Sequence, residues 1–415
     1  MKRTVSIIIK RITICLFALF LFFSFNTQSN AKNVTVVIDP GHGGEALGGN
    51  YEDRIERDIN LITAISMKER LEQYEGVDVY MTRENNTDKE LSRKQRFDIA
   101  QKVNADFLFS IHYNMSEYHT LYGSEVWVAS KGRNYVKGYQ FATIEMEALK
   151  DLGLFDRGIK NKLDKDRTGE YYGILKYSEE YAIPAVIIEH CHLDEERDSA
   201  FWNEQAYKEF GIRDADSVAK YFKLSSTALG IDNSEYERVS VEEPAQRLDM
   251  DRTPPEYCDI EITDNESFVT VDIDSFDPDT YIQYYQYSTD GGLTFGRLEA
   301  WDDRTSKHQS FDVVKPEGED IHLIVRTYNQ YDQYAQSEES VVEGLKIVDE
   351  IHEEPDLTQY ETVVINTEGK NNEHEITPLT VFIVVFVVLF ITFNIFLVIS
   401  LTIKLKAAKK KKRKK

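Results

Sequence analysis

The sequence predicts an α/β domain, an all-β domain after it and a membrane-spanning helix near the C-terminus. Three observations support this architecture. Short apolar runs alternate with amphipathic segments from residue 34 to about residue 224, a pattern typical of α/β domains. Short alternating runs follow Pro254 and Pro255, and residues 379–403 form one long apolar segment.

The first 31 residues have the order of a secretory signal peptide. Basic residues stand at the start, an apolar stretch covers residues 12–25, and the segment closes on the small residue Ala31. A cleaved signal peptide is the first interpretation. An uncleaved N-terminal anchor is the alternative.

Residues 33–224 are expected to form a twisted, mostly parallel sheet flanked by helices. Apolar residues recur at helical spacing at Ile59, Ala64, Met67 and Leu71, and again between residues 91 and 103. The expected strands are short apolar runs between these segments: 34–38, 77–81, 106–111, 124–128 and 185–189.

Residues 225–254 lose this periodicity and are rich in Ser, Glu and Asp, which predicts a linker. Residues 255–345 are expected to form a β-sandwich of the immunoglobulin or fibronectin type. Strands are expected at 257–262, 268–273, 281–287 and 322–328, with a tight turn at residues 289–292. Since no motif here carries chemistry, a spacer is the first interpretation, and a regulator or the binding site of a protein partner is the alternative.

The C-terminal segments predict attachment to a membrane. Residues 346–378 are polar and acidic, which indicates a linker that cannot fold alone. Residues 379–403 are long enough to cross the bilayer, and the tail at 404–415 is strongly basic. Because clustered basic residues stay on the cytoplasmic side, we expect a single-pass protein of the cell membrane whose residues 33–345 lie outside the cytoplasm.

Charge and cysteine content narrow the possible partners. The net charge of −23 understates the acidity of the middle of the chain, because the two ends contribute only basic charges. Such a surface repels nucleic acid, so no nucleic-acid partner is expected. Cys15 belongs to the leader, while Cys191 and Cys258 fall in different expected domains, so we expect free thiols.

The segment VVIDPGHGG at residues 36–44 places His42 among glycines where an apolar strand ends. Ligand sites in open α/β sheets lie at such strand ends. Glycine permits sharp turns and close approach of other groups. A phosphate-binding loop is the alternative, but the Gly-Lys-Ser/Thr of a P-loop is missing.

Further candidate ligands stand at other strand ends. His112 closes the apolar run at 107–111, and two strand-end histidines suit a metal. A hydrolytic zinc site needs a third N or O ligand and leaves one position for water. Glu45, Glu52 and Glu56 are the acidic candidates, and Glu56 precedes a predicted helix that would fix its direction.

Glu189 ends the apolar run AVII at the same kind of edge. A carboxylate beside a metal can take a proton from water and return it to a leaving group. Taken singly, each histidine is more often a packed residue than a ligand, and a lone glutamate more often forms a salt bridge. Four such residues at strand ends and a helix start favour a site.

Six blocks of the chain, taken in order, resemble the zinc-dependent N-acetylmuramoyl-L-alanine amidases of the Amidase_3 type. The resemblance covers about residues 33–222. The blocks are IDPGHGG, ERDINL, LSRKQRFDIA, SIHYN, GSEVWV and PAVIIEH. The resemblance implies that His42, Glu56 and His112 bind zinc and that Glu189 is the catalytic carboxylate.

The same resemblance implies a peptidoglycan hydrolase that cleaves the amide between N-acetylmuramic acid and the first L-alanine of the stem peptide. One departure is that His190, Cys191 and His192 follow Glu189, where the family usually has a small residue and then phenylalanine. A His-x-His pair puts both rings on one face of a strand, so His190 and His192 are alternative ligands. A thiol mechanism at Cys191 is a further alternative.

Two other functions remain as alternatives. The chain could be a non-catalytic surface protein that binds muropeptides or a partner protein. It could also be a zinc carboxypeptidase that acts elsewhere on the stem peptide.

Overall fold

The computed structural model describes residues 32–87 and 89–346. The expected signal peptide at 1–31, the apolar segment at 379–403, the basic tail at 404–415 and nearly all of the acidic linker lie outside the described residues. Within the described ranges, no helix is both long and apolar enough to cross a membrane.

A six-stranded sheet forms the centre of the first domain. Its order is β4-β1-β5-β8-β6-β7. The strands are β1 (Val34–Pro40), β4 (Val77–Met81), β5 (Phe107–Asn114), β6 (Ser124–Val128), β7 (Asp156–Lys160) and β8 (Ala185–His192). The first four strands in this order run parallel, and the pair β6 and β7 runs in the opposite direction. The prediction of a mostly parallel sheet is confirmed, but the sequence does not predict β7, whose side chains are largely charged.

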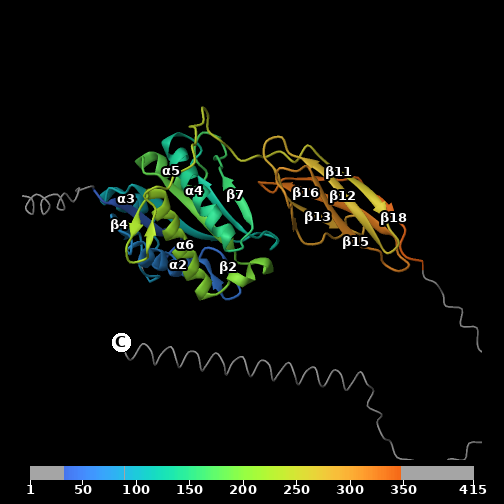
Figure 1. Ribbon diagram of the computed structural model, residues 1–415, viewed down its shortest axis with the longest axis horizontal. Coiled ribbons are helices and arrows are strands. Elements are labelled where there is room, and N and C mark those ends of the chain that lie inside the picture. The colour runs from blue at the N-terminus through green and yellow to red at the C-terminus, as the bar shows by residue number, and fades with distance from the viewer. Residues whose placement is uncertain (1–31, 88, 347–415) are drawn as a thin grey trace, which may run out of the picture. The chain divides into compact units, whose positions relative to one another are not determined.

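Helices cover both faces of this sheet (Figure 1). One face carries α2 (Glu56–Leu71), α4 (Gly132–Asp151) and α6 (Glu204–Phe222), and the other carries α3 (Arg93–Lys102) and α5 (Gly173–Tyr181). Alternate residues of each strand therefore enter two separate apolar cores. Ile188 and Val126 belong to one core, while Ile187 and Trp127 belong to the other. Small elements complete the domain: β2 (Asn50–Tyr51), β3 (Arg54–Ile55), the 3₁₀ helix η1 (Glu196–Phe201), β9 (Ser225–Ser226) and β10 (Ile231–Asp232).

The second domain is rich in β structure, as the sequence predicts. One sheet has the order β11-β12-β15 and the other has the order β14-β13-β16-β17, with β18 paired to β16. Residues from both sheets share one apolar core that includes Val271, Trp301 and Val325. The strands are β11 (Tyr257–Asp264), β12 (Phe268–Phe276), β13 (Ile282–Ser288), β14 (Glu299–Ala300), β15 (His308–Val314), β16 (Ile321–Asn329), β17 (Tyr334–Gln336) and β18 (Ser340–Val342).

All described residues fall in one compact unit, and the two domains meet at the edge strand β7. The fully buried Arg157 of β7 donates hydrogen bonds to the Tyr284 hydroxyl at 3.1 Å and to Asp332 at 2.8 Å. The Gln330 amide donates to the Ile159 carbonyl at 3.0 Å. Residues from sequence-distant parts of the chain therefore share buried polar contacts across this junction.

The segment between the domains lies against the first domain. Arg247 pairs with Glu179 at 2.7 Å and with the buried Glu170 at 3.3 Å. The Leu248 amide donates to the Ser130 carbonyl at 2.9 Å. The residues that the composition predicts as a linker thus make specific contacts with the first domain.

Candidate active site

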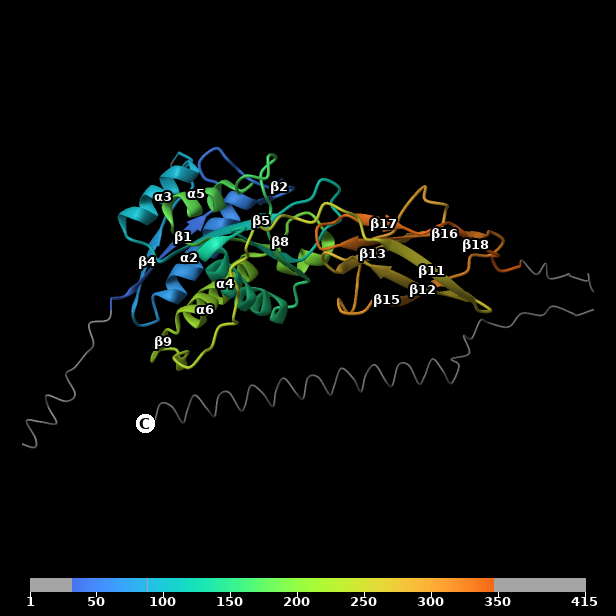
Figure 2. The same ribbon diagram turned by 90° about the horizontal axis from the view of Figure 1, so that it is seen from above.

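The parallel strands β1 and β5 lie side by side (Figure 2). His42 follows the end of β1, and His112 lies near the C-terminal end of β5. His42 has a φ of 63°, and Gly43 and Gly44 follow with φ values of 140° and 54°. A side chain at Gly41 would overlap the His112 ring, and one at Gly48 would overlap both His42 and Glu56. The glycines are therefore required because the histidine loop turns in the left-handed region while the groups of the site approach the backbone closely.

Glu56 is the first residue of α2 and lies between the two imidazoles. Its carboxylate is 3.0 Å from His42 Nε2 and 2.9 Å from His112 Nδ1. The Gly49 amide donates to the same carboxylate at 2.6 Å. Burial alone would raise the pKa of Glu56, but the hydrogen bonds to His112 and His42 lower it far below its usual value. The carboxylate is thus held in its charged form.

These three side chains form a donor set that fits zinc. One ligand atom from each lies within 4.8 Å of the others, and no other group of this kind occurs in the part of the chain that the structure describes. Two imidazole nitrogens and one carboxylate oxygen are ordinary ligands of a hydrolytic zinc site, which keeps one position open. The imidazole side chains of His42 and His112 are 24% and 18% exposed, so substrate can reach the trio.

The other acidic candidates for the metal lie outside this set. Glu52 is 65% exposed and pairs with Arg54 at 2.6 Å. Glu45 is exposed. The structure therefore brings Glu56, and neither of the other two, to the histidines.

Buried basic residues hold the His42 loop, a role that the sequence does not predict. Arg83 donates to the Gly41 carbonyl at 2.7 Å, and Arg96 donates to the His42 carbonyl at 2.7 Å. Arg96 also pairs with the fully buried Asp39 at 2.5 Å. Burial alone would raise the pKa of Asp39, but the Arg96 guanidinium lowers it. Arg83 and Arg96 thus fix the backbone that carries His42.

Glu189 lies in the same row of the sheet as His112. The register pairs His112 of β5 with Glu189 of β8, and Glu189 with Glu125 of β6. Side chains paired in this way point to the same face. The buried Oε2 of Glu189 has no hydrogen-bond partner among the described residues. Burial raises the pKa of Glu189 well above its usual value, and the charges of Glu56 and Glu125 add to this.

Glu125 is the second carboxylate of the row, and the sequence does not single it out. It accepts hydrogen bonds from Asn114 at 2.9 Å, Trp127 at 3.0 Å, Arg157 at 2.9 Å and Lys160 at 2.8 Å. Burial alone would raise its pKa, but the charges of Lys160 and Arg157 hold the pKa well below the usual range. No local pattern in the sequence pairs these strands, so the network emerges only from the fold.

The histidines after Glu189 have structural partners of their own. His190 is fully buried, with Nε2 at 3.0 Å from Asp214 and Nδ1 at 3.0 Å from the His112 carbonyl. His192 faces the Gly123 carbonyl at 3.2 Å, and burial lowers its pKa to about 3. Neither joins His42, Glu56 and His112 in the metal-type cluster.

The cysteines are unsuited to nucleophilic catalysis. Cys191 and Cys258 are free and buried, which confirms the prediction of free thiols. Burial raises the pKa of Cys191 well above its usual value, so little thiolate is present. A thiol mechanism therefore has no support in the geometry.

Comparison with known proteins agrees with this site. Residues 36–220 match the family model described as N-acetylmuramoyl-L-alanine amidase, Amidase_3. This part of the chain is similar to the Amidase_3 domain. Among curated relatives, it is 28% identical over 182 residues to the N-acetylmuramoyl-L-alanine amidase LytC of Bacillus subtilis, covering 42% of this chain and 32% of LytC.

Two further proteins are similar to the same part of the chain. The N-acetylmuramoyl-L-alanine amidase CwlM of Bacillus licheniformis is 28% identical over 200 residues, covering 48% of this chain and 72% of CwlM. Cwp6 from Clostridium difficile, a solved structure, is 27% identical with a TM-score of 0.43, covering 47% of this chain and 30% of that one. The chain spans less than half of the length of the first curated relatives that it matches.

Proposed function

We propose that this protein is a zinc-dependent N-acetylmuramoyl-L-alanine amidase that hydrolyses peptidoglycan. The observation that carries the proposal is the grouping of His42, Glu56 and His112 beside a buried carboxylate, Glu189, on the next strand. The Amidase_3 domain supports the same reaction class. The substrate bond would be the amide between N-acetylmuramic acid and the first L-alanine of the stem peptide.

His42, Glu56 and His112 would hold the zinc ion. When bound, zinc supplies a positive charge that polarises an amide carbonyl and lowers the pKa of water. Glu56 brings the negative charge of the ligand set, and its two histidine contacts fix the direction of its oxygens. Arg83 and Arg96 keep the His42 loop in place through its carbonyl groups.

Glu189 would act as the proton-transfer group. Its Oε2 has no partner among the described residues, so it can accept a proton from the attacking water. It would then return that proton to the nitrogen of the departing alanine. A carboxyl group that is too acidic would not hold the proton between the two steps.

We further propose that the enzyme acts outside the cytoplasm and is held at the membrane. The supporting features are the leader-like residues 1–31, the apolar segment at 379–403 and the basic residues at 404–415. Peptidoglycan close to the cell membrane would then be the substrate. Truncation before residue 377 should release active protein into the medium. Retention of the truncated protein at the membrane would instead indicate an uncleaved N-terminal anchor.

The proposal is tested by measuring zinc content and turnover together. The purified protein should contain about one zinc ion, lose turnover of peptidoglycan on chelation and recover it when zinc is returned. Zinc-loaded protein that binds muropeptides without cleaving them would favour the non-catalytic alternative. Release of free terminal amino acids would favour a carboxypeptidase.

A further inference from the structure

A groove continues from the Glu189 row into the β-rich domain. It encloses about 680 Å³. Asn114, Glu125 and Tyr172 line it from the Amidase_3 domain, and Arg326 and Tyr334 line it from β16 and β17. Both domains therefore contribute walls to one cavity.

The groove begins a short distance from the three candidate zinc ligands, His42, Glu56 and His112. His112, Glu189 and Glu125 occupy successive positions across β5, β8 and β6. Neighbouring strands are ~4.8 Å apart, so Glu125 is about 10 Å from His112 across the sheet. That distance equals roughly three residues of extended chain. A peptide bound with its first amide at the cluster would enter the groove with its next residues.

Most of the charges that line the groove cancel one another. Glu125 pairs with Arg157 at 2.9 Å and with Lys160 at 2.8 Å, and Asp332 pairs with Arg157 at 2.8 Å. Glu117 is exposed and also lines the groove. The charges of Arg157 and Lys160 are therefore compensated within the lining. The two remaining cations of the lining have no carboxylate partner among the described residues.

Those remaining cations are Lys162 and Arg326, one from each domain. Among the described residues, neither takes part in an ion pair. Lys162 Nζ lies 4.0 Å from the centre of the Tyr171 ring. The Arg326 guanidinium lies 3.7 Å from the Phe295 ring centre and 4.7 Å from that of Tyr334. Arg326 Nε also donates a hydrogen bond to Gln336 at 2.8 Å. Stacking orients both side chains, and it leaves the Lys162 ammonium and the terminal nitrogens of Arg326 available to a ligand.

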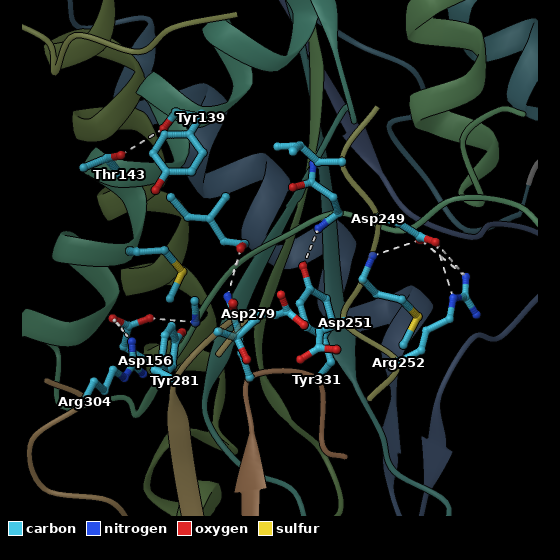
Figure 3. A pocket seen from close by; sticks show the side chains of 18 of the residues that line it. Tyr139, Thr143, Asp156, Asp249, Asp251, Arg252, Asp279, Tyr281, Arg304 and Tyr331 are labelled. Carbon is cyan, nitrogen blue, oxygen red and sulfur yellow. Dashed lines mark hydrogen bonds and ion pairs between the residues drawn. The ribbon is translucent and has the colours of Figure 1, made fainter. Parts of the chain in front are cut away.

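A second cavity between the domains has a lining in which negative charge predominates. It encloses about 940 Å³, and its cations are largely paired with carboxylates, among them Asp156 with Arg304 and Asp249 with Arg252 (Figure 3). Asp251 and Asp279 add further negative charge to its lining. An anionic ligand would be repelled there. In a chain with a net charge of −23, two unpaired cations in the groove beside Glu189 are therefore a specific feature.

We propose that this groove binds the stem peptide beyond the cleaved amide, and that Lys162 and Arg326 together bind a free carboxylate of that peptide. This inference rests on the proposed amidase function and assigns its substrate specificity in part to the β-rich domain. A stem peptide fits because it carries free carboxylates within reach of the cluster. The glycan strand fits less well, because its N-acetyl groups and amide-linked lactyl groups carry no charge.

The test compares two muramoyl-tripeptides that differ only in charge, one with free peptide carboxylates and one with those groups converted to carboxamides. Wild-type protein should cleave the carboxylate form with the higher kcat/KM. Arg326→Gln and Lys162→Gln should each lower kcat/KM for that form roughly three- to tenfold, mainly through KM, and leave the carboxamide form nearly unchanged. Lys307→Gln is the matched control, since Lys307 also stacks on an aromatic ring in the β-rich domain but does not line the groove.

Binding of the free tripeptide product, measured by calorimetry, separates this inference from the proposed function. Product binding that depends on Arg326 without any cleavage would retain the groove and reject the amidase. Equal losses for both substrates in Arg326→Gln would place a neutral part of the substrate in the groove and overturn the inference. Unchanged kinetics and unchanged product binding in both variants would overturn it as well. Equal zinc content in all variants confirms that the cluster is intact.

Discussion

Two carboxylates on neighbouring strands, Glu125 and Glu189, occupy paired positions but have opposite surroundings. Glu125 is surrounded by four donors, two of them cationic, and its pKa is lowered. Glu189 keeps a buried oxygen that has no partner within residues 32–87 and 89–346, and its pKa is raised. A buried polar atom without a partner costs free energy, so its presence needs an explanation. The comparison teaches that the contacts of Glu125 are used within the fold, whereas Glu189 keeps an oxygen available for the proton transfer that we propose.

The surroundings of Glu125 and Glu189 also distinguish two regions of the molecule, the domain junction and the candidate active site. The Glu125 network crosses the domain junction, because Arg157 donates hydrogen bonds to Glu125, Tyr284 and Asp332. The row from His42 to Glu189 faces a partly exposed site and is open. Substitutions in the first region should change stability, and substitutions in the second should change metal binding or turnover.

The largest expected effect is the loss of the metal ligands. His42→Ala, Glu56→Ala or His112→Ala should remove or greatly weaken zinc binding and reduce turnover to background, because one lost donor also loses the geometry of the site. Zinc analysis and peptidoglycan turnover check this. Glu52→Ala is the control and should keep both. Full zinc occupancy in His42→Ala would reject the site.

Removal of Glu125 should cause the next largest effect. Glu125→Ala leaves the buried Arg157 and Lys160 without their shared carboxylate, so the free energy of unfolding should fall by about 3–5 kcal/mol. Urea denaturation followed by circular dichroism measures the change. Glu204→Ala, which removes an exposed partner of Lys208, should leave the midpoint nearly unchanged. A stable Glu125→Ala protein without turnover would reverse the assigned roles of the two carboxylates.

Glu189→Gln should separate chemistry from structure. The substitution keeps the shape of the side chain but removes proton transfer, so turnover should fall by roughly 10²-fold or more while zinc content and stability are kept. Zinc analysis, urea denaturation and turnover on one preparation check all three. Near-normal turnover would mean that Glu189 is structural and that another base serves the reaction.

Asp198 is a third carboxylate, which is hydrogen-bonded like Glu125 but has a raised pKa like Glu189. Its titration predicts how the stability of the protein changes with pH. Asp198 accepts the amides of Gly123 and His192, both at 2.8 Å, yet burial raises its pKa to about 6. The unfolded carboxyl titrates near pH 4, so the folded state binds the extra proton between about pH 4 and 6. This contribution to stability is present at low pH and is lost as the pH rises through 6.

Asp198→Asn should therefore gain stability relative to wild type as the pH rises. Between pH 4.5 and 7.5, the difference between the free energies of unfolding of the variant and the wild type should change by about 2 kcal/mol in favour of the variant. Urea denaturation of both proteins across this range measures it. A constant difference would show that the folded and unfolded pKa values of Asp198 are nearly equal.

Local sequence signals predict the positions of the site residues well. His42 follows β1, His112 and Glu189 lie in the C-terminal halves of β5 and β8, and Glu56 starts α2, so the residues stand near the element boundaries that the sequence predicts. Parallel strands then bring their ends to one edge. The mostly parallel sheet and the β-rich second domain follow from the same periodicity.

The parts that the sequence does not predict depend on pairing across the fold. Arg157 and Lys160 give β7 a charged appearance, and only their contact with Glu125 explains why they are buried. Arg83 and Arg96 are likewise expected at a surface, yet they bind backbone carbonyls under the His42 loop. The groove depends on the docking of β16 and β17, which no local pattern specifies.

Mass spectrometry of peptidoglycan digested by the purified protein tests the central claim most directly. The account predicts intact stem peptides with a new L-alanine amino end, together with uncut glycan strands whose lactyl groups carry free carboxylates. The yield of these products should fall by roughly 10²-fold or more with Glu189→Gln and should be lost after chelation of zinc. Cleavage at another bond of the stem peptide, or the same products from zinc-free protein, would contradict the account.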